Sequence, residues 1–413
     1  MRNKNSTVSV EEAQQIILNS VSPLNGENIS LMEASNRVLY EDIVSDIMIP
    51  SVDDSAMDGY AIIADDTHGA SKDSPIKLQI IGEIQAGGAI SGEEVSRGTA
   101  IRIMTGAPIP GGADSVIRFE DTEEEAGYVK ILRETVKYNN YRVAGENIKK
   151  GDRVLQKGDR LRSADVGILA SLNYSAVKVY KQPTVSIIST GDELADLGEG
   201  IKIGQIRNVN MYTLYSEVKK YNGLPDYLGI AKDTLKDTKE TFLKALKSDV
   251  VISTGGVSMG KYDFVKEIYS DLNIEIQFEW VNVKPGKPCT FGKKDNKLIF
   301  GLPGNPVPTL TSFIQFVRPA LLRLMGARRI TKPIVNAYLE KDINKQPGKV
   351  HLLLRGYFTI RNNEFYVSPT VNQKPSALRS MSGANCLIVI PENRAGAKAG
   401  EKVAIQLIHH DEI

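Results

Sequence analysis

Cysteine and histidine are scarce in this chain of 413 residues, which has two cysteines and four histidines. Cys289 and Cys386 stand far apart and no CxxC pair occurs, so the sequence carries neither a disulfide framework nor a zinc motif. None of the histidines stands at a metal-ligand spacing with another type of ligand. We therefore expect a protein of the reducing cytoplasm whose chemistry relies on carboxylates, lysines, backbone amides and metal.

Long apolar runs and a strong net charge are also missing. The apolar stretches are short and broken by glycine or proline, so we expect no membrane span, and residues 1–10 contain no apolar signal core. The net charge of +1 provides no general attraction for nucleic acid or for an anionic membrane. Any anion that this protein binds must therefore be held by a local site.

The length indicates several domains, because a single hydrophobic core stops growing at roughly 250–300 residues. Residues 51–148 are rich in glycine and in short alternating stretches, which is typical of an all-β domain. An N-terminal helix with Ser9 and Glu12 as a capping box, and a helix–strand pattern in residues 149–180, flank that segment. The pattern predicts that residues 1–50 and 149–180 form one domain into which the β domain is inserted.

Residues 181–326 alternate strands with helices, which predicts a three-layer α/β domain with a mostly parallel sheet. Residues 327–413 contain short β-like runs and are interpreted as a small barrel or sandwich. Helices are predicted at residues 10–17, 30–36, 163–172, 210–221, 235–246 and 309–324. Strands are predicted at residues 76–81, 100–104, 176–180, 185–189, 227–231, 249–253, 334–339, 350–357, 365–367, 386–390 and 403–407.

Two strand ends in the α/β segment carry the strongest functional signals. Strand 185–189 runs into TGDE at residues 190–193, and strand 249–253 runs into TGGVSMG at residues 254–260. Since parallel strands end at one edge of a sheet, and ligands bind there, both loops are expected to line one site. The first loop supplies carboxylates, and the second supplies backbone amides that can hold phosphate.

The second loop nearly matches the P-loop pattern GxxxxGK[ST], from Gly255 to Lys261. The next residue is Tyr262, and a tyrosine is too long to replace the serine or threonine hydroxyl that holds magnesium in a P-loop. This substitution disfavours a P-loop kinase or nucleotide triphosphatase.

Three further segments are candidates for the same site. In KPGKP, Lys284 and Lys287 flank a rigid turn, so that two ammonium groups can converge on one oxyanion. LPGNPVP at residues 302–308 is a stiff loop before a helix, where prolines cost no helical hydrogen bond. DDSAMD at residues 53–58 places three acids close together, as metal or acid–base sites do. Each segment alone is an ordinary loop or turn, and only their combination predicts a site.

Six ordered blocks carry a resemblance to a known family. They are SAMDGY at 55–60, RIMTGAPIP at 102–110, STGDEL at 189–194, STGGVSMGKYD at 253–263, KPGKP at 284–288 and GLPGNPVP at 301–308. With them the chain resembles the molybdopterin molybdotransferases, which include the bacterial enzyme and the C-terminal domain of the animal scaffold protein gephyrin. The resemblance covers essentially the whole chain.

The resemblance implies a multidomain α/β plus β fold and a homodimer whose active site lies between the α/β domain of one subunit and domains of the other. The implied domains are an elongated α+β dimerisation domain (1–50 and 149–180), the inserted β domain (51–148), an α/β molybdopterin-binding domain (181–326) and a C-terminal β-barrel (327–413). The implied reaction inserts molybdate into adenylylated molybdopterin with Mg²⁺, cleaves the pyrophosphate bond and releases AMP. A contact with the molybdopterin adenylyltransferase that supplies the substrate is also implied.

The resemblance also implies roles for single residues. The catalytic residues are Asp58, Thr105, Glu193, Asp233 and Asp263. The residues that bind the pterin substrate are Thr190, Gly191, Asp192, Thr254, Gly255, Gly256, Ser258, Pro303, Gly304 and Pro306. The molybdate ligands are Lys284, Lys287, Arg355 and Ser380, whose cationic and hydroxyl donors suit a tetrahedral dianion. The metal ligands are Glu193, Asp263 and Glu146.

The chain departs from the family at one position that matters for charge. The family commonly has Gly-Glu-Asp where this chain has Gly145-Glu146-Asn147, and an asparagine cannot serve as a carboxylate ligand. Either that charge is not needed, or metal binding is weaker or uses Glu146.

Two alternatives within this fold stay open. A gephyrin-like scaffold without enzymatic activity would leave the acids dispensable, whereas the acidic and basic loops are intact here. A paralogue that inserts tungstate is the second alternative, because molybdate and tungstate have nearly the same size and charge.

Overall fold

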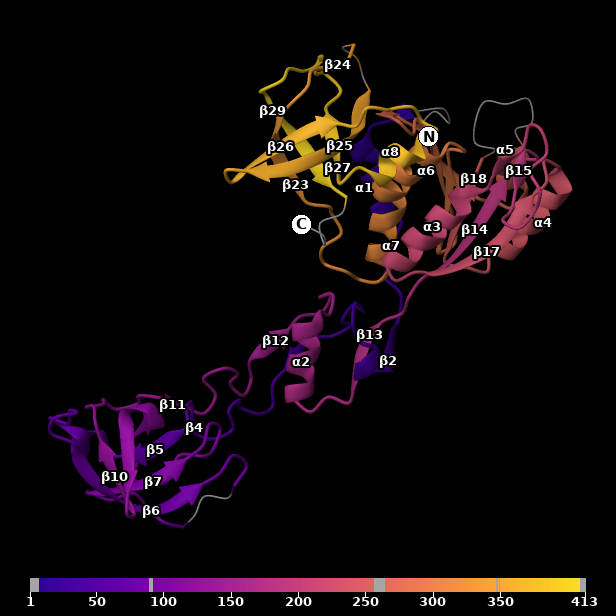
Figure 1. Cartoon of the computed structure of the whole chain (residues 1–413). Coiled ribbons are helices and arrows are strands. Elements are labelled where there is room, and N and C mark those ends of the chain that lie inside the picture. Colours follow the sequence, from indigo (N-terminus) through magenta and orange to yellow (C-terminus); the bar gives the residue numbers. More distant parts are fainter. Residues whose placement is uncertain (1–6, 89–91, 256–263, 347, 349, 409–413) are drawn as a thin grey trace. The chain divides into compact units, whose positions relative to one another are not determined.

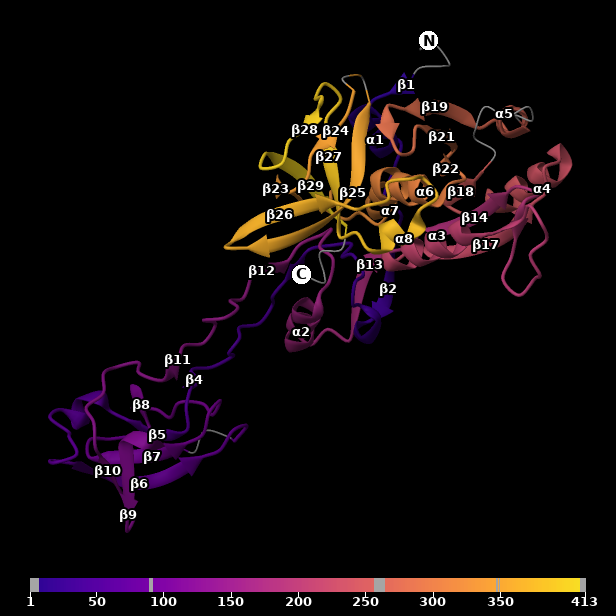
Figure 2. The same ribbon diagram turned by 45° about the horizontal axis from the view of Figure 1, so that its top comes forward.

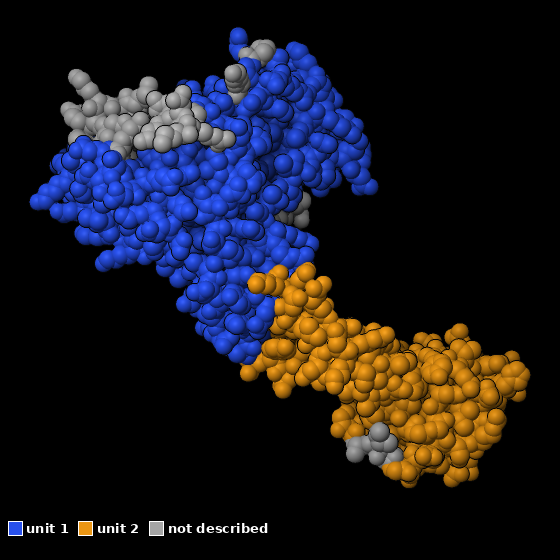
Figure 3. Space-filling model, turned by 180° about the vertical axis from the view of Figure 1, so that it is seen from behind, with its two compact units in different colours: residues 1–41, 158–163, 176–413 blue, residues 42–157, 164–175 orange. Residues whose placement is uncertain are grey.

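A computed structural model describes residues 7–88, 92–255, 264–346, 348 and 350–408, and the chain forms two compact units, coloured separately in Figure 3. Unit 1 comprises residues 1–41, 158–163 and 176–413, and unit 2 comprises residues 42–157 and 164–175. The β domain expected at 51–148 therefore lies within a unit that interrupts the other in sequence. The finer division into four domains stays a prediction.

The largest sheet of unit 1 has seven strands in the order β1-β19-β21-β22-β18-β14-β17. Its strands are β1 (Thr7–Val8), β14 (Thr184–Thr190), β17 (Leu224–Ala231), β18 (Val250–Thr254), β19 (Glu275–Val281), β21 (Pro288–Lys294) and β22 (Lys297–Leu302). Strands β17, β14, β18 and β22 are parallel, β1 runs parallel to β19, and only β21 is antiparallel to its neighbours. The expected mostly parallel sheet is confirmed.

Helices cover both faces of this sheet. They are α1 (Val10–Asn19), α3 (Val209–Lys220), α4 (Leu235–Ala245), α5 (Phe264–Asp271), α6 (Pro306–Ser312), the π-helical turn η4 (Phe313–Val317) and α7 (Arg318–Leu324). Alternate residues of each strand serve opposite faces: Ile187 and Ile252 pack with α3 and α7, whereas Ile188 and Val251 pack with α4 and α5. Figure 1 shows α3 and α4 on opposite sides of β14. The expected three-layer arrangement is confirmed.

The N-terminal helix forms as its capping box predicts. The Ser9 hydroxyl accepts a hydrogen bond from the Glu12 amide at 3.1 Å, and the Glu12 carboxylate accepts one from the Ser9 amide at 2.9 Å. The helix expected at residues 30–36 is wrong, because only the 3₁₀ turn η1 (Leu31–Glu33) forms there. Ser30 caps Met32 locally, and Asn36 has a φ of 65°, which ends any helical continuation.

The C-terminal region of unit 1 is a closed barrel in which β25, β26, β23, β29 and β27 pair in a ring (Figure 2). These strands are β23 (Ile334–Leu339), β25 (His351–Arg361), β26 (Glu364–Pro369), β27 (Cys386–Ile390) and β29 (Lys402–Leu407). Beside them lie β20 (Val283–Lys284), which pairs with β25, the pair β24 (Ile343–Asn344) and β28 (Gly396–Ala397), and helix α8 (Leu378–Ser382). Of the two folds left open for this region, the barrel is confirmed.

Two short pairs complete unit 1. They are β2 (Gly26–Ser30) with β13 (Ala176–Tyr180), and β15 (Leu194–Ala195) with β16 (Ile206–Arg207). Within the part of the chain that the structure describes, no helix has both the length and the apolarity needed to span a membrane.

Unit 2 contains a six-stranded sheet in the order β8-β5-β7-β6-β10-β9. Its strands are β5 (Gly59–Ile62), β6 (Ile76–Ile84), β7 (Thr99–Ile103), β8 (Ser115–Arg118), β9 (Thr122–Glu125) and β10 (Tyr128–Ile131). Further elements are β3 (Ile43–Val44) with β12 (Arg153–Leu155), β4 (Asp54–Ser55) with β11 (Tyr141–Arg142), the 3₁₀ turns η2 (Ala64–Thr67) and η3 (Phe119–Asp121), and α2 (Ser163–Ser171). Both faces of the sheet are buried, since Tyr60 and Ala61 belong to different apolar clusters.

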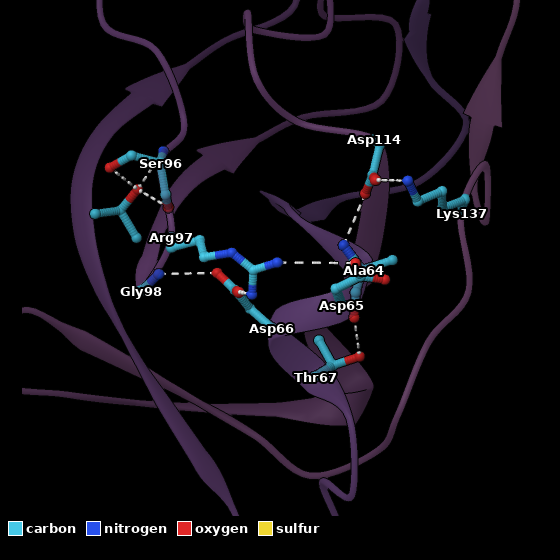
Figure 4. Close-up of polar contacts among 10 residues, drawn as sticks. Ala64, Asp65, Asp66, Thr67, Ser96, Arg97, Gly98, Asp114 and Lys137 are labelled. Carbon is cyan, nitrogen blue, oxygen red and sulfur yellow. Dashed lines mark hydrogen bonds and ion pairs between the residues drawn. The ribbon is translucent and has the colours of Figure 1, made fainter.

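Carboxylates fasten the turn η2 inside the β domain, as Figure 4 shows. Asp66 accepts a hydrogen bond from the Gly98 amide at 2.8 Å. Asp114 accepts one from the Ala64 amide at 2.7 Å and lies 3.3 Å from the Lys137 ammonium. These acids are therefore engaged in holding the domain's own loops.

Candidate active site

The strand ends of the parallel sheet bring four loops to one edge. In the sheet register Thr254 pairs with both Ser189 and Leu302, and Thr190 pairs with Ala231. The loops that follow β14, β17, β18 and β22 therefore start side by side. This arrangement agrees with the expectation that the TGDE and TGG segments line one edge.

Three of these loops contact one another, and glycine makes the close approach possible. The Thr190 hydroxyl donates to the Thr254 carbonyl at 3.0 Å, and the Gly255 amide donates to the Leu302 carbonyl at 3.3 Å. A Cβ on Gly255 would lie 2.5 Å from the Thr190 carbonyl oxygen, and one on Gly304 would lie 3.7 Å from the Gly255 Cα. Gly255 also has a φ of +84°, which a side chain would strain.

The carboxylates lie on the first and second of these loops. Asp192 and Glu193 are exposed, and Asp192 accepts a hydrogen bond from the Asp233 amide at 3.3 Å, which joins the loops after β14 and β17. The Glu193 side chain folds back over Gly191, where a Cβ would meet the Glu193 Oε2 at 2.5 Å. Asp233 is also exposed. Acidic groups are thus available to a ligand along this edge.

Side chains of helices α6 and α3 hold the LPGNP loop in a fixed conformation. The Thr309 hydroxyl lies 2.6 Å from the Pro303 carbonyl oxygen and 2.7 Å from that of Asn305. The Asn210 side-chain amide of α3 donates to the Gly304 carbonyl at 2.7 Å, while its Oδ1 is buried and without a partner among the described residues. Pro306 starts α6, as expected for a proline at the first helical position. Sequence reasoning missed Asn210, because helical spacing does not reveal that it contacts a loop 94 residues away.

The two lysines of KPGKP both extend to the surface. Lys284 ends β20 and Lys287 follows Gly286, and both lysine side chains are exposed. Gly286 has a φ of +107°, and a Cβ there would meet the Ser312 hydroxyl of α6 at 2.9 Å. The turn therefore packs tightly onto α6, and the ammonium groups of both lysines have no partner among the described residues and can meet an anion.

Arg355 of β25 is almost fully enclosed, with 1% of its surface exposed. Its guanidinium donates to the Ser380 hydroxyl at 2.8 Å and to the Asn372 carbonyl at 2.9 Å, and burial lowers its pKa. The Val307 amide donates to the Pro375 carbonyl at 3.2 Å, so the loop organised by Arg355 lies against the start of α6. Arg355 and Ser380 lie in contact with each other, and their binding of molybdate stays a prediction.

The three acids of residues 53–58 in unit 2 differ in whether their carboxylates are occupied by other side chains. Asp53 accepts from the Tyr141 hydroxyl at 2.6 Å, and Asp54 forms a two-point pair with Arg142 at 2.7 and 3.0 Å. Asp58 is exposed, and its Oδ1 accepts from the Thr105 amide at 2.7 Å and from the Thr105 hydroxyl at 2.8 Å. These two bonds, the amide first, lower the pKa of Asp58 and keep it charged. Of the three acids, only Asp58 is thus available to a ligand.

The predicted metal ligands and the rest of the TGGVSMGKYD loop remain to be located. Glu146 is exposed in unit 2. Gly256, Ser258 and Asp263 lie outside the described residues. No group of three or more His, Cys, Asp or Glu side chains able to hold a metal forms within the described ranges. The exposed carboxylate of Glu193 nevertheless fits magnesium, which binds through one or two carboxylates together with substrate phosphates and water.

Comparison with known proteins places this geometry in a family. Three family models match consecutive parts of the chain: the MoeA N-terminal region (domain I and II) at residues 8–173, the probable molybdopterin binding domain at 186–323, and the MoeA C-terminal region (domain IV) at 336–408. A molybdopterin molybdenumtransferase of Staphylococcus epidermidis is 36% identical over 405 residues, covering 98% of this chain and 96% of that protein. The chain belongs to the MoeA family.

Other MoeA proteins agree along the whole length. A molybdopterin molybdenumtransferase of Staphylococcus aureus is 37% identical over 413 residues, covering 99% of this chain and 97% of that protein. The crystal structure of the molybdopterin biosynthesis moeA protein from Pyrococcus horikoshii superimposes with a TM-score of 0.84 at 34% identity, covering 98% of this chain and all of that one. The family expected from the six sequence blocks is thereby confirmed, together with the multidomain fold.

Proposed function

We propose that this protein inserts molybdate into adenylylated molybdopterin, cleaves the pyrophosphate bond of that substrate and releases AMP. The observation that carries the proposal is the edge of the α/β sheet, where closely packed glycine loops meet exposed carboxylates in a member of the MoeA family. In this reaction the two dithiolene sulfurs of the pterin become ligands of molybdenum.

The loops after β14, β18 and β22 bind the pterin substrate in this proposal. Gly304 is exposed and leaves the backbone accessible to a phosphate, and the rigid Pro303 loop fixes the shape of the wall. Thr190 and Thr254 hold the two loops in register. Binding in a fixed orientation contributes to the rate, because the reacting groups need not be ordered during the reaction.

Magnesium is the cation of this proposal, held by Glu193 with Asp263 and Glu146. When bound, it neutralises negative charge that develops on the phosphate oxygens. Asp58, Thr105 and Asp233 supply further polar contacts to the substrate. Asp58 takes part in substrate binding as a carboxylate at neutral pH, since the hydrogen bonds from Thr105 lower its pKa.

Molybdate is the second substrate. Lys284 and Lys287 bind the dianion through exposed ammonium groups. Arg355 and Ser380 complete its surroundings, with Arg355 also shaping the loop that carries Asn372. The proposal includes a cytoplasmic homodimer and a contact with the adenylyltransferase that makes the substrate, and the homodimer is tested by the mass of the purified protein in solution.

The function is tested by measuring AMP release from adenylylated molybdopterin with magnesium, in the presence and absence of molybdate. Molybdate-dependent release is expected. Replacing molybdate by tungstate in the same assay separates a tungstate-inserting enzyme from the proposed one. No AMP release from a folded, pterin-binding protein would overturn the proposal in favour of a scaffold.

A further inference from the structure

A chain of three side-chain hydrogen bonds lies behind the carboxylate loop. The Ser189 hydroxyl donates to the Asn208 Oδ1 at 3.0 Å, and the Asn208 Nδ2 donates to the Tyr227 hydroxyl oxygen at 2.9 Å. The Tyr227 hydroxyl in turn donates to the Asp196 Oδ2 at 3.0 Å. Every donor points in the same direction, from β14 through the start of α3 and β17 to the residue after β15, and the chain ends on a carboxylate.

This relay, Ser189–Asn208–Tyr227–Asp196, is largely shielded from water. Ser189 and Asn208 are 0% and 2% exposed, and the second carboxylate oxygen of Asp196 is buried without a partner among the described residues. Burial raises the pKa of Tyr227, and the Asp196 carboxylate adds to the effect, so the hydroxyl stays a donor. Hydrogen bonds in such surroundings strengthen one another, and losing one leaves buried polar groups unpaired.

The relay fixes a segment that starts at the candidate carboxylate Glu193. In this arm, residues 194–207, β15 and β16 pair in parallel. The Arg207 guanidinium donates to the Asp196 carbonyl at 2.5 Å, and the Ile206 amide donates to the Glu193 carbonyl at 2.8 Å. Asn208 additionally caps α3 by accepting from the Met211 amide at 3.4 Å. These bonds join Asp196 and the backbone of Glu193 to the same strand, β16.

We propose that Tyr227 is a positioning residue of the reaction, which holds Glu193 in its working place by closing the relay to Asp196. This inference rests on the proposed function, since Glu193 is a catalytic carboxylate only there. The Tyr227 hydroxyl is hydrogen-bonded to Asn208 and Asp196, so its effect passes through the arm. Neither its neighbours in sequence nor helical or strand periodicity would single it out, because its partners come from three other segments.

The first test compares Tyr227→Phe with Tyr215→Phe in the full-length protein. Tyr215 is a matched control on α3, half-buried, with its ring beneath Lys219 and with no hydrogen bond of its hydroxyl in the described structure. Tyr227→Phe removes both hydrogen bonds of the hydroxyl and is expected to lower kcat for AMP release roughly 3–10-fold, an effect of the size that a hydrogen bond contributes. The KM for adenylylated molybdopterin should change less than twofold, and the magnesium concentration for half-maximal rate should rise. Equal kcat values for both variants would overturn the proposal.

Coupling to Glu193 distinguishes positioning from a general loss of stability. If Tyr227 acts through Glu193, then adding Tyr227→Phe to Glu193→Asp lowers kcat by less than the product of the two separate effects. Independent, multiplying losses would contradict the relay. Asp196→Leu removes the final acceptor of the relay and is expected to show the same coupling to Glu193. It replaces Tyr227→Phe in this test if that variant yields too little folded protein.

A structural readout separates failure of the relay from failure of the proposed function. Amide hydrogen exchange in residues 194–208 is expected to be faster in Tyr227→Phe than in the parent protein, and unchanged in Tyr215→Phe. If the parent protein releases no AMP, the proposed function fails, and faster exchange in this segment still supports the relay. Unchanged exchange in Tyr227→Phe would overturn the relay whatever the activity.

Discussion

Asp58 is the candidate residue whose charge is controlled by a single neighbour. Both hydrogen bonds to its Oδ1 come from Thr105, one from the amide and one from the hydroxyl. The pKa of Asp58 lies below its usual value for this reason, with the amide contributing more. Because the lowered pKa belongs to the folded state, the stabilising effect is present at neutral pH and is lost as the pH falls through that pKa.

Thr105→Val should raise the pKa of Asp58 without restoring its ordinary value, because the amide bond remains. We expect the acid limb of the rate of AMP release to move to higher pH, as a larger fraction of Asp58 becomes protonated. The pH profile of the rate, together with a carboxyl titration by NMR, measures both effects. Thr105→Ser keeps the hydroxyl and should behave like the parent; a profile unchanged in Thr105→Val would exclude a charged Asp58 from the reaction.

The role of a single residue could be predicted from the sequence only where its partners lie close to it along the chain. The three acids of residues 53–58 look equivalent in sequence, yet Asp53 and Asp54 are occupied by Tyr141 and Arg142, 88 residues away. Such long-range partners leave no local signal. Asn210, which holds the Gly304 carbonyl, was missed for the same reason.

At the scale of elements, the contact between the β14 and β18 loops depends on Gly255. Its φ of +84° and the 2.5 Å approach of a Cβ to the Thr190 carbonyl are two separate obstacles to any side chain. Gly204 has a φ of +89°, but a Cβ there would meet no atom within 4 Å, so it carries only the first obstacle. Comparing alanine substitutions at Gly255 and Gly204 therefore separates the cost of backbone strain from the cost of steric overlap.

Gly255→Ala is expected to lower the free energy of unfolding by roughly 2–4 kcal/mol, and Gly204→Ala by about 1 kcal/mol. Chemical denaturation of both variants measures the difference. Gly255→Ala should also lower activity, because Thr190 must move. Equal destabilisation of the two variants would show that the loops are not in tight contact.

Strand β25 carries a half-buried histidine where it pairs with the lysine-bearing strand β20. His351 pairs with Val283 in register, and its Nδ1 lies 3.8 Å from a Glu11 carboxylate oxygen of α1. Burial lowers the pKa of His351 below 6.5 more than Glu11 and Glu392 raise it, and Lys345 also acts to lower it. The folded state therefore binds fewer protons than the unfolded state below pH 6.5, and stability falls on acidification through that range.

His351→Gln should flatten this dependence. We expect the parent protein to lose more of its thermal midpoint between pH 7.5 and 5.5 than the variant does, measured by differential scanning calorimetry. Glu217, whose pKa is raised by burial, has the opposite effect on stability, but it is present in both proteins and cancels in the comparison. An equal loss of thermal midpoint in both proteins would contradict a lowered pKa of His351.

The elements themselves were largely predictable where the pattern is strong and local. Strands at 176–180, 334–339 and 386–390 have the expected bounds, and the helices near 210–221 and 235–246 agree within one residue at each end. Strands β19, β21 and β22, at residues 275–302, were not predicted individually, since the antiparallel return of β21 depends on pairing rather than on composition. The π-helical turn Phe313–Val317 within the expected helix 309–324 likewise has no sequence signal.

At the scale of the whole molecule, the six sequence blocks are distributed over both compact units. SAMDGY and RIMTGAPIP belong to unit 2, and the other four belong to unit 1. Family and fold were accessible from the sequence because these blocks keep their order along the full chain. How the two units come together depends on surfaces that no motif encodes.

The central claim is that the carboxyl edge of the α/β sheet performs molybdenum insertion, and Glu193→Gln tests it most directly. Glu199→Gln is the matched control, an exposed glutamate six residues along, whose side chain has no hydrogen bond or ion pair in the described structure. AMP released and molybdenum bound to the pterin product should be measured together in one incubation with magnesium and molybdate. We predict that Glu193→Gln lowers both by roughly 100-fold or more while the protein stays folded, and that Glu199→Gln leaves both unchanged. Unchanged AMP release and molybdenum insertion in Glu193→Gln would contradict the account.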